Sequence, residues 1–288
     1  MTLDEFLLQA LNGLSFGALL FVLASGFTLV FGLMHIVNLA HGAFYLVGGY
    51  VGIVTATATG SFLAAIVAGA ATAAVIGLAS ERLLLRRVRG KELPEVLLTV
   101  GIALVVADAC LAAFGGNPRS IPVPSVLSES VRLGDITYPT YRLFVISLAV
   151  ALGALLYVVQ HRTRFGALIR AGVDDREIAE SLGIDVPRVF TAMFVFGAAL
   201  AGLAGVVAAG LLTLRPGADI DILLFALVVV VVGGLGSLEG AAVGSALIGL
   251  VDAFSKVWVP EFSYFAVFAP MAIVLMFRPA GLFGRSRT

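Results

Sequence analysis

The chain has 288 residues, of which 60% are hydrophobic and 12% charged, and its formal net charge is zero at pH 7. Soluble domains have roughly 45–50% apolar and about 25% charged residues, so this composition excludes an ordinary soluble fold. The zero net charge argues against a polyanionic partner such as nucleic acid. Apolar segments continue from end to end without a large polar block, which predicts a single transmembrane domain over 1–288.

A transmembrane helix needs about 20 mostly apolar residues. The candidate segments are 6–30, 42–59, 61–80, 96–114, 142–159, 187–211, 222–236, 240–257 and 262–277. Of these, 222–236 is short for a span, and the residues that interrupt 31–49 are Gly32, Asn38, His41, Gly42, Gly48 and Gly49. We expect an all-α polytopic membrane protein with 8–9 transmembrane helices and broken or re-entrant segments near 31–49 and 228–244.

Basic residues predict the orientation, because cytoplasmic loops are rich in Lys and Arg. They cluster in the loops 81–95 and 160–188 and in the C-terminal tail, which we expect to face the cytoplasm. Nine crossings with the N-terminus outside satisfy all three clusters, whereas a re-entrant segment at 31–49 would lower the count by one and place the N-terminus inside. The loop 115–141 is then extracytoplasmic, with a hairpin around Gly134-Asp135, and is either a cap or a rim that contacts a docking partner.

The first interrupted region, GLMHIVNLAHGAFYLVGGY at residues 32–50, places polar groups at membrane depth. Asn38 and His41 are three residues apart, hence on one helix face, and Gly42 follows directly. Such groups are costly in lipid unless they face a cavity or a protein neighbour. A hydrogen bond between helices and a contact with substrate both remain open for Asn38 and His41.

The second interrupted region, VVVVVGGLGSLEGAAVGSALIG, occupies residues 228–249. It contains a GxxxGxxxG ridge typical of close helix packing, and that packing explains most of the glycines. Two glycine-broken segments, one in each half of the chain, also point to a translocation pathway. The predicted pathway residues are Asn38, His41, Gly42, Gly233, Gly234, Gly236 and Ser237.

The second basic loop contains a short helix pattern, AGVDDREIAESLGIDVPRV. Asp174 and Glu177 form a capping box, Gly183 stands where a glycine ends a helix, and Pro187 suits the first turn of the next span. These positions predict an amphipathic helix of about two turns near 175–182, which is too short to be stable alone in water. It either lies on its own membrane domain or docks into a groove of a cytoplasmic partner.

This loop resembles the coupling loop of ABC-importer permeases, the element that receives the ATPase stroke. The family's Glu-Ala-Ala…Gly pattern is matched loosely by Glu177-Ile178-Ala179 followed by Gly183. The resemblance implies a set of ATPase-coupling residues: Arg170, Asp174, Arg176, Glu177, Glu180 and Gly183.

The two interrupted regions, with the coupling loop between them, resemble the Liv-type permeases of branched-chain amino acid importers, most closely the shorter H-type subunit. The resemblance implies a multi-pass protein of a bacterial or archaeal inner membrane, surrounded by membrane lipid. Its implied partners are a second, M-type permease, two ABC ATPases and an extracytoplasmic substrate-binding protein. ATP hydrolysis would reside in those ATPases, so the chain itself is expected to be no enzyme. Relatives that carry urea, short amides or aromatic carboxylates leave the cargo open.

The main alternative is a passive channel of the aquaporin or urea-channel type. Asn38-Leu39-Ala40 differs by one residue from that family's Asn-Pro-Ala motif, but such channels normally carry the motif twice and no second copy occurs. An intramembrane protease would need a membrane serine or aspartate pair that the sequence does not supply. The GxSxG match at 13–17 lies in an apolar helical run without a preceding strand. No Walker A motif and no metal-ligand spacing occur, so we expect no cofactor and no metal.

Overall fold

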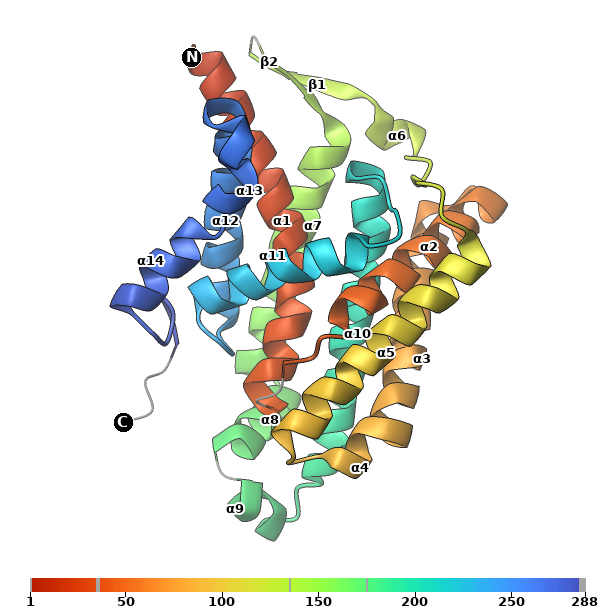
Figure 1. Ribbon diagram of the computed structural model, residues 1–288, viewed down its shortest axis with the longest axis vertical. Helices are drawn as coiled ribbons and strands as arrows, with labels where there is room; N and C mark the ends of the chain where they lie inside the picture. Colours follow the sequence, from red (N-terminus) through yellow and green to blue (C-terminus); the bar gives the residue numbers. More distant parts are fainter. Residues whose placement is uncertain (1, 35–36, 135, 175, 285–288) are drawn as a thin grey trace.

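The computed structural model describes residues 2–34, 37–134, 136–174 and 176–284, and within them the chain is almost entirely helical (Figure 1). The elements are, in order, α1 (Leu3–Met34), α2 (His41–Thr59), α3 (Phe62–Ser80), the π-helical turn η1 (Glu81–Leu85), α4 (Arg86–Val88), α5 (Glu92–Phe114), α6 (Ser125–Ser128), β1 (Ser130–Leu133), β2 (Ile136–Pro139), α7 (Thr140–Arg162), α8 (Arg164–Asp174), α9 (Arg176–Ser181), α10 (Val186–Leu211), α11 (Ala218–Gly233), α12 (Leu238–Trp258), the 3₁₀ turn η2 (Pro260–Phe262), α13 (Ser263–Ala266) and α14 (Ala269–Phe277).

Eight segments of the described chain are long and apolar enough to cross a membrane, which confirms the expected all-α polytopic fold. They are Leu3–Gly32, His41–Thr59, Phe62–Val88, Glu92–Phe114, Thr140–Arg162, Val186–Leu211, Leu238–Trp258 and Pro260–Phe277. The helix α11 has 16 residues. At 1.5 Å per residue it is about 24 Å long, shorter than a hydrocarbon core of about 30 Å. It runs across α1 rather than alongside it (Figure 1).

The centre of the bundle is built where α2, α3 and α10 pack on one another and on α1. Small residues bring their backbones together: a Cβ on Gly48 would lie 2.3 Å from the Cα of Gly202, and one on Gly205 would lie 1.9 Å from the carbonyl oxygen of Tyr45. Lipid offers no hydrophobic force between helices, so such close contacts supply the van der Waals attraction that holds them. The outer helices α7 and α14 are mostly exposed on the surface of the bundle.

Gly48 and Gly49 do not interrupt the chain, which corrects the expected extent of the first break. Both lie inside the continuous helix α2, where a Cβ on Gly49 would lie 2.9 Å from the carbonyl oxygen of Gly205. Glycine weakens a helix by roughly 0.5–1 kcal/mol relative to alanine, and here close packing against α10 offsets that cost. The described part of the break is therefore residues 37–40, between the end of α1 at Met34 and the start of α2 at His41.

The crossing of α1 and α12 explains the GxSxG match at 13–17. A Cβ on Gly13 would lie 2.8 Å from the Cα of Leu250, and one on Gly17 would lie 2.6 Å from the carbonyl oxygen of Ser245. On the facing helix, a Cβ on Gly249 would lie 2.3 Å from the carbonyl oxygen of Gly13. The two glycines of the match are therefore a small-xxx-small contact between helices.

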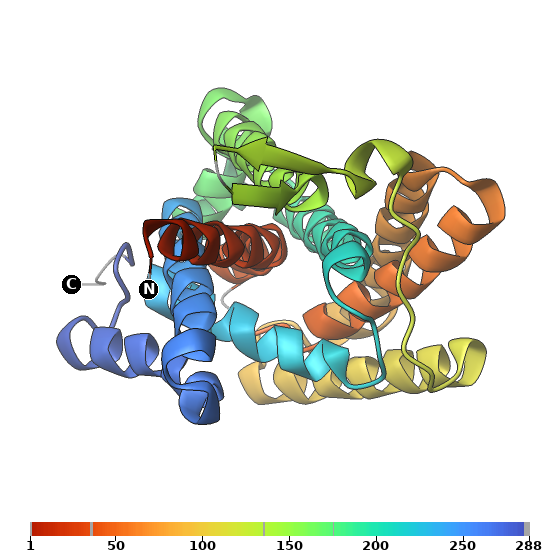
Figure 2. The same cartoon turned by 90° about the horizontal axis from the view of Figure 1, so that it is seen from above.

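The two ends of the bundle carry different loops (Figures 1 and 2). The N-terminus, α6 and the β1–β2 hairpin lie at one end, and α4, α8 and α9, from the two basic loops, lie at the other. This arrangement agrees with a chain whose N-terminus shares a side with the loop 115–141. The predicted hairpin is confirmed, with Val131 paired to Tyr138 and Leu133 to Ile136, although Asp135 lies outside the described residues.

The C-terminal segment folds back onto the end of α11. The N–H groups of Leu282 and Phe283 donate to the carbonyl oxygens of Val232 and Gly233, each at 2.9 Å. The last four carbonyls of a helix have no partner within it. The C-terminal segment therefore satisfies two of them and holds the turn between α11 and α12 in place.

Candidate functional site

Asn38 and His41 lie beside the first break, and both are buried, with 3% and 0% of their surfaces exposed. Asn38 closes the turn into α2, because its Oδ1 accepts from the N–H of Ala40 at 3.1 Å. The Nε2 of His41 donates to the carbonyl oxygen of Leu23 at 3.0 Å, and its ring packs edge-on against Phe27. His41 thus forms the hydrogen bond between helices that the sequence left open beside a substrate contact. Its Nδ1 is buried without a partner in the described chain.

The residues around them fasten the break to two further helices. The N–H of Leu39 donates to Oγ1 of Thr99 in α5 at 3.2 Å. A Cβ on Gly42 would lie 2.3 Å from the carbonyl oxygen of Asp219 in the first turn of α11, so only glycine fits there. The start of α2 is therefore held by α1, α5 and α11 together.

The second break is a glycine turn between α11 and α12. Gly234 and Gly236 have φ values of 105° and 83°, a region that favours glycine. A Cβ on Gly233 would lie 2.2 Å from the carbonyl oxygen of Gly240. Ser237 begins α12 as its N-cap, with Oγ accepting from the N–H of Gly240 at 3.0 Å. Conformation and space both require the glycines of this turn.

The last turn of α1, just before the first break, approaches the second break at one point, where a Cβ on Gly32 would lie 3.0 Å from the Cα of Gly236. Asn38 and His41 bond instead to their own turn and to α1. Gly42 packs on the N-terminal end of α11, whereas the glycine turn follows its C-terminal end. The predicted pathway residues therefore lie near the two ends of α11 and are not gathered in one pocket.

An apolar groove of about 340 Å³ opens between α1, α7 and α12. Small side chains line much of it, among them Gly17, Ala18, Ala149, Gly153, Ala242 and Ser245. None of the predicted pathway residues lines this groove.

The basic loop 160–188 contains two helices, where the sequence predicted one. α9 spans Arg176–Ser181, in place of 175–182, and α8 precedes it as an amphipathic helix of 11 residues. Its sequence, RFGALIRAGVD, directly follows the end of the long span α7. Ile169 of α8 and Ala179 of α9 share a buried apolar cluster with the first turns of α10. Neither helix stands alone, as their short lengths require.

The predicted end of α9 is confirmed. The N–H of Gly183 bonds to the carbonyl of Glu180 at 3.0 Å and that of Ile184 to the carbonyl of Ala179 at 3.1 Å, while Gly183 has φ 82°. This is the Schellman arrangement of a helix C-terminus. Pro187 lies in the first turn of α10, also as predicted, behind an Asp185 N-cap.

The implied coupling residues are only partly described. Arg170 is exposed on α8, and its Nη1 donates to the carbonyl of Gln160. Glu180 and Gly183 are exposed at the end of α9. The side chains of Asp174, Arg176 and Glu177 lie outside the described part of the chain, and so does their predicted capping box. Beside them, Ile178 and Leu182 present apolar side chains that are 59% and 76% exposed.

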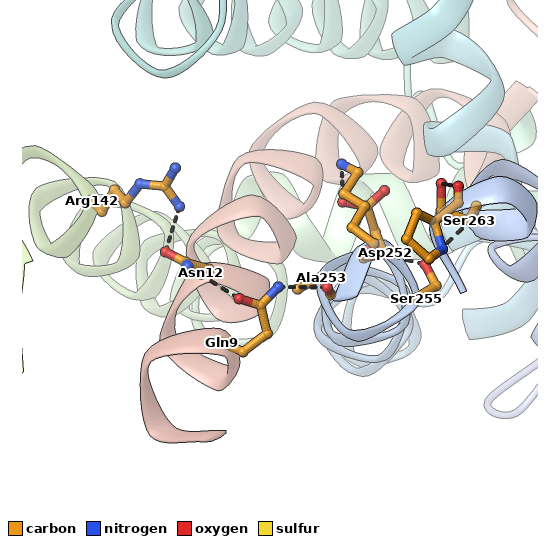
Figure 3. Close-up of polar contacts among 9 residues, drawn as sticks. Gln9, Asn12, Arg142, Asp252, Ala253, Ser255 and Ser263 are labelled. Atoms are coloured by element: carbon orange, nitrogen blue, oxygen red, sulfur yellow. Dashed lines mark hydrogen bonds and ion pairs between the residues drawn. The ribbon is translucent and has the colours of Figure 1, made fainter. Parts of the chain in front are cut away.

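A polar network at the opposite end was missed from the sequence (Figure 3). Nη1 of Arg142 donates to Oδ1 of Asn12 at 2.7 Å, and Nε2 of Gln9 donates to the carbonyl of Ala253 at 2.5 Å, which ties α1 to α7 and α12. Gln9 and Asn12, three residues apart in an apolar span, were the available indication. On α12, Nζ of Lys256 pairs with Oδ2 of Asp252, four residues before it, at 2.6 Å. In the described part of the chain, no three His, Cys, Asp or Glu side chains are grouped to hold a metal.

Comparisons with known proteins identify the family of the chain. Residues 9–275 match the family described as "Branched-chain amino acid transport system / permease component". The chain is 30% identical to the high-affinity branched-chain amino acid transport system permease protein BraD of Pseudomonas aeruginosa, over 98% of this chain and 96% of that protein. It is 28% identical to LivH of Escherichia coli K12, over 97% and 96% of the two chains. A solved structure of PsaBC from Streptococcus pneumoniae in complex with Fab aligns with a TM-score of 0.49 and 14% identity, over 92% of this chain and 89% of that one. With its membrane-spanning helices and a family match over nearly its whole length, the chain belongs to the permease-component family of branched-chain amino acid transport systems, as a multi-pass protein of the cell membrane.

Proposed function

We propose that the chain is one permease subunit of an ATP-driven importer that moves branched-chain amino acids across the inner membrane. The observation that carries this proposal is the approach of the last turn of α1, at Gly32, to the glycine turn at Gly236, with α11 linking that turn to the start of α2. Backbone interrupted at membrane depth needs a wet cavity or a protein neighbour, and lipid supplies neither. The family match supports the cargo class.

The route in this proposal passes the residues of both breaks. Asn38 lies in the first break, His41 and Gly42 begin the helix that follows it, and the turn Gly233–Ser237 forms the second break. A second, M-type permease would complete the route on the open side of α11. His41 is fully buried, so its role within the chain is to hold α2 on α1 while the route opens and closes beside it.

The drive in this proposal enters through α8 and α9. The exposed apolar pair Ile178 and Leu182 suits a groove on an ATPase, while Ala179 anchors α9 to the permease. One of the two ATPases would dock here and the other on the second permease, while an extracytoplasmic binding protein would deliver cargo at the end that carries the β1–β2 hairpin. Urea, short amides and aromatic carboxylates are the other cargo classes to test.

A matched pair of glycine variants tests the route. In Gly236→Leu the new side chain takes a positive φ and collides with Gly32, whereas in Gly60→Leu it takes a similar φ of 68° in open space. The expected result is loss of radiolabelled leucine uptake in cells that express Gly236→Leu with its partner subunits, and retained uptake in Gly60→Leu. Equal uptake by both variants would contradict the assigned route.

The same uptake assay separates the importer from a passive channel. An importer accumulates leucine against its gradient and stops when cellular ATP is depleted. A channel of the aquaporin or urea type would equilibrate its solute with or without ATP, and ATPases would not co-purify with the chain. Uptake that survives ATP depletion would overturn the proposed function.

A further inference from the structure

Glu81 is a carboxylate at the end of α3 that is 0% exposed. It lies in the π-helical turn η1, a distortion that is rare in helices and frequent at functional sites. One oxygen, Oε1, pairs with Nη2 of Arg89 at 2.5 Å, and the other, Oε2, accepts from Oγ1 of Thr191 at 2.8 Å. These contacts join the α3–α5 loop to the second turn of α10.

On the α10 side, this ion pair reaches the coupling helices. The guanidinium of Arg89 lies 4.9 Å from the centre of the Phe190 ring, within the range of a cation–π interaction. Phe190 belongs to the buried apolar cluster that contains Ile169 of α8 and Ala179 of α9. Any displacement of α8 and α9 therefore bears directly on the residues that hold Arg89.

On the α5 side, the ion pair reaches the first break. The N–H of Gly90, next to Arg89, donates to Oε1 of Glu95 at 3.0 Å, and Glu95 is only 2% exposed. Four residues on, and hence on the same face of α5, Thr99 accepts the N–H of Leu39. A rigid helix thus connects the loop at Arg89 to the turn that begins α2.

We propose that Glu81 is a positioning residue of the transport cycle: its buried pair with Arg89, bonded to Thr191, is the joint that transmits movement of α8 and α9 through α5 to the break at residues 37–40. The proposal rests on the proposed function. A buried pair suits this task because removing one partner leaves an uncompensated charge, so the two groups stay together as the helices move. Exposed pairs such as Asp185 with Arg188 are weak by comparison.

The test measures how accessible the first break is to a labelling reagent, so it does not depend on which cargo is carried. Ala40→Cys is placed in a Cys110→Ser background, and the chain is purified with its second permease and ATPases. Labelling of Cys at position 40 by a maleimide is compared with and without ATP and vanadate, which trap the ATPases. The matched variants are Glu81→Gln, Thr191→Val and the double change Glu81→Gln with Arg89→Gln. Two variants are controls. Arg87→Gln, at an exposed position of the same loop, removes the same positive charge as Arg89→Gln, and Thr191→Ser keeps the hydroxyl.

The expected result is a nucleotide-dependent change in labelling in the parent, in Arg87→Gln and in Thr191→Ser. In Glu81→Gln and Thr191→Val that change should fall about tenfold while the ATPases stay bound, a typical size for coupling between sites. The double variant removes both charges, so it should recover the thermal midpoint that Glu81→Gln loses without recovering the response at position 40. If the double variant recovered both the thermal midpoint and the labelling response at position 40, the pair would be merely structural and the proposal would be overturned.

Three further outcomes also decide between the joint, a role in assembly and failure of the proposed function. A parent-like labelling response in Thr191→Val and Glu81→Gln, with ATPases bound, would overturn the joint and leave the proposed function intact. Loss of the ATPases from these variants alone would place Glu81 in assembly and contradict transmission. A parent chain that recruits no ATPase would overturn the proposed function and the joint with it.

Discussion

At the scale of single residues, missing side chains decide how closely the helices approach. Gly205 and Gly48 of α10 and α2 allow contacts that any Cβ would block, and Gly101 of α5 faces open space. The same residue type therefore has opposite effects on stability at different positions. Composition alone cannot separate the two cases, because all three glycines stand in apolar helical runs.

Gly205→Ala and Gly101→Ala should change the stability of the protein in opposite directions. In Gly205→Ala the new Cβ would lie 1.9 Å from the carbonyl oxygen of Tyr45, so we expect a loss of about 1–3 kcal/mol in the free energy of unfolding. In Gly101→Ala the Cβ meets nothing within 4 Å, and better helix propensity should add roughly 0.5–1 kcal/mol. Thermal unfolding of the detergent-purified chain measures both, and a Gly205→Ala protein as stable as the parent would contradict this packing.

At the scale of elements, α8 and α9 depend on the way α9 ends. Gly183 combines a positive φ with an N–H that bonds to Glu180, and the following residue returns a bond to Ala179. These bonds satisfy the final carbonyls of α9 and direct the chain into α10. The orientation of α9 on the permease is therefore set by its C-terminal turn and by its share of the apolar cluster.

Gly183→Pro should uncouple ATP hydrolysis from transport. Proline lacks the N–H and holds φ near −65°, so it abolishes the bond to Glu180 and the turn itself. Charge reversal at Arg176 or Glu177 should act in the same direction if these residues contact the ATPase. Insertion of the membrane helices should be unaffected, and Gly60→Pro in the turn after α2, with a φ of 68°, is the control for strain. Transport per ATP hydrolysed is the measurement, and a normal ratio in Gly183→Pro would reduce α9 to a connector.

At the scale of the whole molecule, the loops divide into two groups at opposite ends of the bundle. The basic loops 81–95 and 160–188 lie together, and the hairpin loop lies opposite them (Figure 1). The excess of Lys and Arg in the first group predicts that this end faces the cytoplasm. The described residues of the C-terminal segment cap the last turn of α11.

Cysteine labelling tests this orientation. In a Cys110→Ser background, Val126→Cys places a thiol at a position 79% exposed in the hairpin loop, and Leu182→Cys places one at a position 76% exposed beside α9. A membrane-impermeant maleimide applied to intact spheroplasts should label the first and spare the second. Labelling should reverse in inside-out vesicles. Labelling of Leu182→Cys from outside would invert the predicted orientation.

Sequence by itself determined the membrane class, most of the spans, the hairpin around Gly134 and the C-terminal end of α9. These features depend on local properties: total apolar content, runs of about 20 residues, and the backbone preferences of glycine and proline. The family resemblance was also readable, because its motifs are contiguous stretches. The first break, described at residues 37–40, was predicted in place but too wide, since glycine content alone does not distinguish a broken helix from a tightly packed one.

Only the tertiary structure decided which distant groups meet. His41 bonds to Leu23, Gly32 meets Gly236, and Thr191 bonds to Glu81 across 110 positions of sequence. Each contact depends on how helices cross, and helix crossing depends on side-chain packing that no local pattern specifies. The buried pair of Glu81 and Arg89 illustrates the limit: in sequence these residues belong to an ordinary basic loop, and only packing against α10 removes the carboxylate from water and gives it two partners.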